Sequence, residues 1–148
     1  MSAWRAFIES ASDLQTALDR DLVAHGTTMG DYQVLVYLSE AESASMRMCD
    51  LADVLQLSPS GLTRRLDGLV RSGHVSRVPS EQDGRVMMAK LTPTGRDLLA
   101  EIAPHHVASV RRRIFDHLDD DQVVAMASIF DAISRGLVAA ESDASEAT

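Results

Sequence analysis

The chain is poor in the residues on which several classes of protein depend. Among its 148 residues there is one cysteine, Cys49, and aromatic side chains make up only 4%. A single cysteine excludes an intramolecular disulfide framework and fits a reducing compartment. No apolar run approaches the length of a membrane span, and no basic segment followed by an apolar core resembles a secretory leader. We therefore expect one cytoplasmic domain with no membrane partner.

Histidine and cysteine form no recognisable catalytic or metal-binding pattern. The five histidines are scattered, and the adjacent His105 and His106 diverge by about 100° on a helix, so they cannot both face one metal ion. His117 and Asp121 have a ligand-like spacing but lie across a predicted helix break. We expect no enzyme activity, no metal and no cofactor, and we interpret Cys49 as a small buried residue rather than a redox switch.

The acidic excess is unevenly distributed along the chain. The formal net charge is −8, yet between residues 47 and 96 eight basic side chains face five acidic ones, which leaves +3 there and −11 elsewhere. Phosphate binding responds to the local field, so a basic segment within an acidic protein remains compatible with DNA binding. The acidic remainder disfavours an architectural protein that coats nucleic acid without regard to sequence.

A helix is predicted over residues 59–72. Ser58 can accept hydrogen bonds from first-turn amides, Pro59 sits where no amide is needed, and Gly73 permits a left-handed stop. One face of the helical wheel is aliphatic, and the opposite face carries short polar and guanidinium groups. Arginines on such a face can bind guanine through two hydrogen bonds in the DNA major groove. An ordinary amphipathic surface helix has the same pattern, so the flanking segments decide between the two interpretations.

The segments on both sides of this helix indicate a DNA-binding fold. Residues 49–56 form a short apolar helix joined to the next by two residues, so the two helices should cross steeply, as in a helix-turn-helix. Residues 75–78 and 86–91 flank a turn rich in Pro, Ser, Asp and Gly, which predicts a hairpin. Arg85 at this turn would suit a narrow minor groove. This order predicts a winged helix-turn-helix.

Two glycines within the predicted helix 59–72 need an explanation. Gly61 and Gly68 each lower helix stability by about 1 kcal/mol relative to alanine. A close approach of nucleic acid, or of a packed neighbouring helix, would offset this cost.

These motifs together resemble the multiple antibiotic resistance regulator (MarR) family of winged-helix transcription factors. The resemblance covers residues 4–137 and rests on four motifs in the expected order: Leu51-Ala52, the segment 58–69 with its pair Thr63-Arg64, Val75-x-Arg77 followed by Asp83-x-Arg85, and Leu91-Thr92-x-x-Gly95. Two positions depart from the family pattern. Gly84 replaces a residue that is often basic, and Met48 replaces a capping Ser or Thr.

The resemblance implies a mainly α fold of the α+β class, a winged helix-turn-helix with N- and C-terminal dimerisation helices. It divides the chain into an N-terminal dimerisation helix (1–30), a winged helix-turn-helix DNA-binding region (31–92), C-terminal dimerisation helices (93–139) and a disordered acidic tail (140–148). The DNA-binding residues that we expect are Ser58, Ser60, Gly61, Thr63, Arg64, Arg65, Arg71, Arg77, Asp83 and Arg85.

Helices are also expected outside the DNA-binding segment. Residues 4–24 carry one apolar stripe, and Thr28 followed by Asp31 resembles a capping box. A long helix should begin after Thr92 and run to about residue 118, with a kink or break at Pro104. A last helix should begin near Asp119. The first and last helices have apolar faces that are wider than the DNA-binding region (residues 31–92, called the head below) can cover. This predicts a homodimer.

We therefore expect a homodimeric, sequence-specific regulator of transcription that binds double-stranded DNA at a near-palindromic operator, and more specifically a repressor. By the resemblance, a small and often aromatic molecule would release it. The candidate ligand-binding residues are Trp4, Phe7, Tyr32 and Tyr37, although core packing explains each of them equally well. A ligand-independent or redox-responsive regulator, and a protein-interaction module without DNA binding, remain alternatives.

Overall fold

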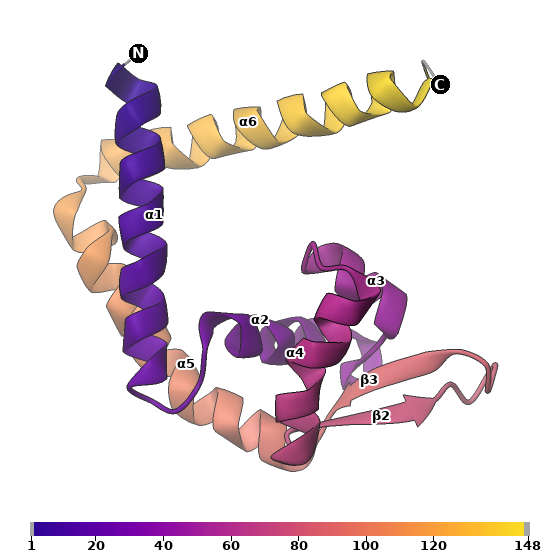
Figure 1. Ribbon diagram of the computed structural model, residues 1–148. Helices are drawn as coiled ribbons and strands as arrows, with labels where there is room; N and C mark the ends of the chain where they lie inside the picture. Colours follow the sequence, from indigo (N-terminus) through magenta and orange to yellow (C-terminus); the bar gives the residue numbers. More distant parts are fainter. Residues whose placement is uncertain (1, 147–148) are drawn as a thin grey trace. The chain divides into compact units, whose positions relative to one another are not determined.

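The computed structural model describes residues 2–146, with side chains to residue 139 (Figure 1). Its compact units are Met1–Ser109 and Val110–Thr148. The helices and strands are α1 (Ser2–Val23), α2 (Met29–Glu40), β1 (Ser45–Arg47), α3 (Met48–Val54), α4 (Pro59–Arg71), β2 (Val75–Pro79), β3 (Met87–Leu91), α5 (Pro93–Arg113) and α6 (Asp120–Glu146), with 3-10 turns at Glu42–Ala44 and Phe115–His117. The mainly helical fold class with a winged helix-turn-helix is confirmed.

The first unit has one hydrophobic core between α2, α3, α4 and the sheet, closed by the first half of α5. The apolar residues of this core with at most 2% of their surface exposed are Val34, Leu35, Leu38, Leu51, Leu62, Leu66, Val75, Ala89 and Ile102. Each element buries only one face, because apolar residues recur with the helical or strand period. The core therefore fixes which face of α4 remains exposed.

Helix α4 has the caps and the buried face that the sequence predicts. Ser58 Oγ accepts a hydrogen bond from the Gly61 amide at 3.1 Å, and Pro59 is the first helical residue. Leu62, Leu66 and Leu69 are buried, as the helical wheel requires. Gly73 follows the helix with φ of +77°, a left-handed conformation that glycine adopts without a Cβ clash.

The sheet has three antiparallel strands with β3 in the centre. Strands β2 and β3 form the predicted hairpin, in register from Val75 opposite Leu91 to Pro79 opposite Met87. Strand β1 was not predicted, because three residues are too few to show an alternating pattern. It pairs along the other edge of β3, with Ser45 opposite Lys90.

The start of α5 is docked closely on the turn between α4 and β2. Thr92 Oγ1 accepts from the Gly95 amide at 3.0 Å, which confirms Thr92 as the cap, and donates to the Gly73 carbonyl at 2.6 Å. Thr94 Oγ1 donates to the same carbonyl at 2.8 Å. A Cβ on Gly95 would overlap the carbonyl oxygen of His74. Gly95 is therefore needed because two backbone segments meet there.

Two expectations about the C-terminal half are corrected. Helix α5 continues through Pro104 without a break and ends at Arg113, ahead of the predicted position 118. One missing amide near the middle of a long helix removes a single bond, and the neighbouring turns retain theirs. Helix α6 extends to Glu146, so the backbone of 140–146 is helical where we expected disorder, which agrees with the high helix propensity of Ala and Glu. Residues 147–148 lie outside the described part.

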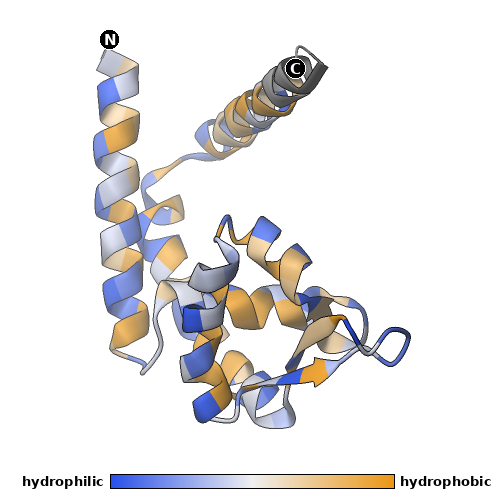
Figure 2. Ribbon diagram, turned by 45° about the vertical axis from the view of Figure 1, so that its right-hand side comes forward, coloured by the Kyte–Doolittle hydropathy of each residue, from blue (hydrophilic) through white to orange (hydrophobic). Residues whose placement is uncertain are grey.

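Helix α6 begins with a reciprocal pair of capping bonds. Asp119 Oδ1 accepts from the Gln122 amide at 2.8 Å, and Gln122 Oε1 accepts from the Asp119 amide at 3.0 Å. Apolar residues recur along this helix (Figure 2). By length and composition alone the stretch Asp120–Ala139 is apolar enough to cross a membrane, and none of it is buried. This finding corrects our expectation that no apolar run approaches the length of a membrane span. The stretch also contains the paired charges Asp131 and Arg135.

Candidate nucleic-acid interface

The outer face of α4 is polar and accessible, because its aliphatic face is committed to the core. Ser60, Thr63 and Arg64 are exposed on successive turns. Thr63 Oγ1 donates to the Pro59 carbonyl at 3.0 Å, which holds this side chain close to the helix. Within the described residues, Arg64 makes no hydrogen bond or ion pair, so its guanidinium is available to a ligand.

An open groove runs beside α4, with a volume of about 540 Å³. Its lining residues come from the start of α2, the turn before α4, and α4 itself: Thr28, Asp31, Leu57, Gly61, Arg64, Arg65, Gly68 and Arg71. A Cβ on Gly68 would meet no atom within 4 Å, so no neighbouring helix of the described structure explains this glycine. Three arginines against one aspartate make the groove a basic surface, which suits a phosphate backbone.

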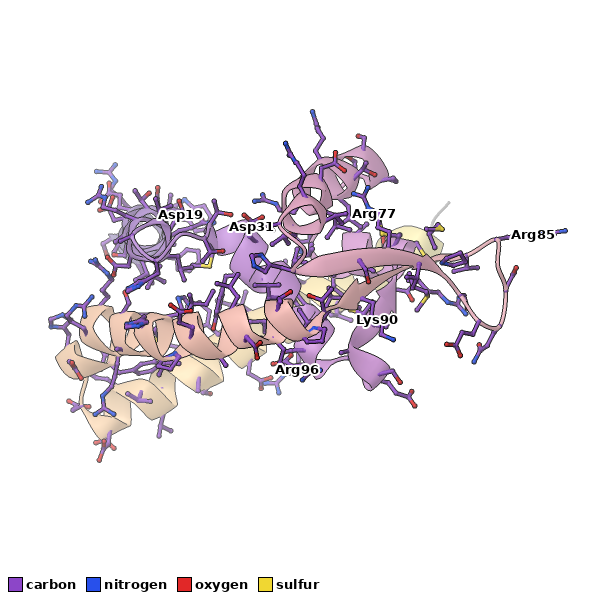
Figure 3. The ribbon with its side chains drawn as sticks, turned by 90° about the horizontal axis from the view of Figure 1, so that it is seen from below. Asp19, Asp31, Arg77, Arg85, Lys90 and Arg96 are labelled. Carbon is purple, nitrogen blue, oxygen red and sulfur yellow. The ribbon has the colours of Figure 1, made fainter. Side chains whose placement is uncertain are left out.

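The turn of the hairpin is shaped by its own polar side chains. Asp83 Oδ1 accepts from the Arg85 amide at 3.0 Å, and the Ser80 amide donates to the Val86 carbonyl at 2.8 Å. These bonds hold the backbone of the turn while the Arg85 side chain extends from its end into solvent (Figure 3). Asp83 therefore stabilises the conformation of the turn. Arg85 is the charged group exposed at the tip of the β2–β3 hairpin, which is the wing of the fold.

Two of the expected DNA-binding arginines are engaged inside the head. Arg77 Nη2 donates to the Thr63 carbonyl at 2.8 Å and to Asp67 Oδ1 at 2.9 Å. Arg65 Nη1 donates to Thr28 Oγ1 at 3.4 Å and lies 3.8 Å from Asp31 Oδ1. Both arginines are half-buried, whereas Arg64, Arg71 and Arg85 are exposed. Sequence reasoning missed these pairings, since their partners lie 10 to 37 residues away.

The four aromatic residues expected near a ligand fall into separate groups. The rings of Trp4 and Phe7 lie 6.1 Å apart on α1. The ring of Tyr32, on α2, is tilted over that of His106 at 4.6 Å. Burial, with a smaller contribution from the charge of Glu40, raises the pKa of Tyr32 above its ordinary value, and burial lowers the pKa of His106.

The histidines are less scattered in space than in sequence. His25 stacks on His105 with 4.0 Å between the ring centroids, while His106 turns toward Tyr32, so the adjacent pair diverges as the helical geometry predicts. Among the described residues, no group of three or more His, Cys, Asp or Glu side chains is arranged to hold a metal ion.

The prediction that Cys49 is buried is wrong. Its side chain is exposed, with Sγ 3.4 Å from Asp50 Oδ1. Helix α3 has only seven residues, and Leu51 and Ala52 take its inward positions, which leaves Cys49 on the outer side of the first turn. The N-cap of this helix is Arg47, with Met48 as the first helical residue, and within the described residues no side chain caps the first turn.

Comparison with known proteins agrees with this geometry. The MarR family profile matches residues 25–86. The crystal structure of AbsC, a MarR family transcriptional regulator from Streptomyces coelicolor, is 38% identical, covers 92% of each chain and has a TM-score of 0.86. Sco3205, a MarR family regulator from the same organism solved in complex with DNA, is 34% identical over 91% of this chain and 85% of that chain, with a TM-score of 0.85.

A more distant relative also aligns with most of the chain. The transcriptional repressor YetL of Bacillus subtilis is 22% identical over 130 residues, which is 88% of this chain and 78% of that protein. These relatives are regulators of transcription and not enzymes. With α4 as its capped reading helix, its three-stranded sheet and its wing, this chain belongs to the MarR family of winged helix-turn-helix transcriptional regulators.

Proposed function

We propose that the protein is a homodimeric, cytoplasmic repressor that binds a near-palindromic double-stranded operator and is released by a small, aromatic molecule. The observation that carries this proposal is the exposed face of α4, where Arg64, which has no partner among the described side chains, lies beside two hydroxyl side chains, Ser60 and Thr63. Guanidinium and hydroxyl groups on one face of a helix can form hydrogen bonds with base edges in the major groove.

Each remaining residue of the interface has a proposed role that follows from its exposure and contacts. Ser60, Thr63 and Arg64 face bases, while Ser58 and Gly61 allow the start of α4 to approach the backbone. Arg71 lines the basic groove and neutralises a phosphate, and Arg85 enters the minor groove from the wing. Asp83 keeps the wing in shape. Arg65 and Arg77 contribute by supporting α4.

The apolar surface of the long helices supports a dimer. On α1, Trp4 is 67% exposed and Ile8 is 45% exposed. On α6, Val124 is 69% exposed and Leu137 is 62% exposed. A second copy that covers these apolar side chains would stabilise the association by about 25 cal/mol for each Å² of apolar surface removed from water. Two-fold symmetry would then present two reading helices to two half-sites.

The ligand proposal rests on the aromatic groups. Trp4 and Phe7 are exposed beside each other on α1, and Tyr37 is 38% exposed on α2. Tyr32, in contact with His106, is the fourth candidate. A ligand that binds one arrangement of the two reading heads better than another is sufficient to change operator affinity.

The test is selection of bound duplexes from a random DNA pool at near-physiological salt. We expect enrichment of a near-palindrome whose half-site centres lie about 10 base pairs apart. Arg64→Ala should weaken binding to the selected site by about 1–3 kcal/mol and relax its specificity. Arg111→Ala, which removes an exposed arginine of the other unit, is the matched control and should bind as the wild type does. A folded dimer that enriches no sequence would refute the proposal.

A further inference from the structure

Arg77 differs from the other arginines of the head in what it touches. It comes from β2, and its guanidinium reaches α4, where one nitrogen bridges the Thr63 carbonyl at 2.8 Å and the Asp67 carboxylate at 2.9 Å (Figure 3). Its Nε is buried, and its side chain is 27% exposed. Little of this enclosed group is therefore left on the surface for a phosphate to contact.

The contact to a carbonyl is the informative one. The Thr63 carbonyl belongs to the backbone of the reading helix, so the bond constrains the helix itself rather than a flexible side chain. Asp67, one turn further along α4, is bound by the same nitrogen and adds a charge-assisted bond. The two contacts together tie β2 to α4 at two points one helical turn apart.

Arg65 makes a corresponding connection to α2. Its guanidinium lies over Gly30 so closely that a Cβ there would be 2.7 Å from Nη2 and closer still to the rest of the group. From this position it reaches Thr28 and Asp31 in the first turn of α2. The contacts are longer than those of Arg77, and the absence of a side chain at residue 30 is what makes room for them.

We propose that Arg77 and Arg65 are positioning residues, which hold the reading helix against the wing on one side and against α2 on the other, and that neither contacts DNA. This inference rests on the proposed DNA-binding function. Base recognition then depends on the angle at which α4 is held, while the charge that meets the phosphates and the minor groove comes from Arg71 and Arg85.

The salt dependence of binding separates the two roles. Each lost phosphate contact reduces the slope of log K against log salt concentration by about 0.9. Arg77→Gln should raise the Kd for the selected operator about tenfold while leaving the slope and the Kd for random duplex unchanged. Arg85→Gln and Arg71→Gln, the matched controls, should reduce the slope and weaken both kinds of binding. A reduced slope for Arg77→Gln, with equal losses on both duplexes, would overturn the inference.

Asp67 provides a test in which the two hypotheses predict opposite signs. Removing a carboxylate from the face of α4 should strengthen DNA binding if Asp67 merely competes with phosphate for Arg77. If Arg77 positions the helix, Asp67→Ala should instead weaken operator binding and leave random duplex binding equal or stronger. Tighter operator binding by Asp67→Ala would contradict the proposal even if Arg77→Gln failed to fold.

Gly30→Ala tests Arg65 without altering any charge. The added methyl group displaces the guanidinium, so we expect operator affinity to fall several-fold while the salt slope stays constant. An unchanged operator affinity would contradict the role of Arg65. If the wild-type protein selects an operator but the Arg77, Asp67 and Gly30 variants do not give the results expected above, only the positioning role fails. If the wild-type protein selects no operator, the proposed DNA-binding function fails as well.

Discussion

Replacing Gly95 with alanine should detach the start of α5 from the turn that follows α4. The new Cβ would overlap the His74 carbonyl oxygen and lie 2.8 Å from Leu91 Cδ1. The obstacle on the carbonyl side is backbone, which cannot rotate away as a flexible side chain can. The substitution must therefore shift α5 relative to residues 73–74 or distort one of the two segments.

The magnitude follows from the bonds that cross this contact. The Thr92 amide donates to the His74 carbonyl at 3.1 Å, and the Thr92 and Thr94 hydroxyls donate to the Gly73 carbonyl. Losing two of these bonds costs about 2 kcal/mol. Overpacking adds about 1–3 kcal/mol, and the higher helix propensity of alanine offsets about 1 kcal/mol. We expect a net loss of about 2–4 kcal/mol in the free energy of unfolding.

The assay is urea unfolding followed by circular dichroism, with all variants at one protein concentration because dimerisation would make stability concentration-dependent. Gly68→Ala is the matched control, since a Cβ on Gly68 meets no atom within 4 Å and should stabilise α4 by up to about 1 kcal/mol. The two glycine replacements should thus have opposite signs. A Gly95→Ala protein as stable as the wild type would refute the reasoning.

Three further outcomes test other parts of the structure. Leu66→Ala removes a fully buried side chain of α4 and should cost about 2–5 kcal/mol in urea unfolding; a loss below about 1 kcal/mol would contradict its place in the core. Burial lowers the pKa of His106, so the unfolded chain binds its proton first and stability falls as the pH drops below the ordinary histidine value of 6.5; titrated unfolding of His106→Gln should show a flatter decline there, and an identical profile would argue against the burial. Asp119→Ala removes the cap of α6 and should cost about 1 kcal/mol by thermal unfolding, whereas no change would mean that Gln122 alone suffices.

The parts of the fold that sequence predicted are those governed by neighbouring residues. Ser58, Pro59 and Gly73 act within a few positions of α4, so the limits of that helix were predicted to within one residue. The hairpin was predicted for a similar reason, because its strands are joined by a short turn. Strand β1 was missed, since it is stabilised by pairing with a segment more than 40 residues away.

The candidate interface was predicted in its position but not in its internal connections. Helical periodicity predicted that Ser60 and Arg64 share an outer face with Thr63 at its flank, because an α-helix repeats every 3.6 residues whatever surrounds it. The same periodicity gave no indication that Arg77 reaches back to α4. A long side chain has several rotamers, and its choice depends on which partner the fold brings within reach.

The sequence by itself determined the reading helix with its caps and buried face, the concentration of basic residues near it, and the resemblance to MarR regulators, because each depends on residue order and spacing alone. Tertiary structure decided that Arg65 and Arg77 are engaged within the head, that Cys49 is exposed, and that Gly95 lies where two backbone segments meet. These features arise from contacts between segments distant along the chain, and such contacts exist only once the core has set the orientation of each helix and strand.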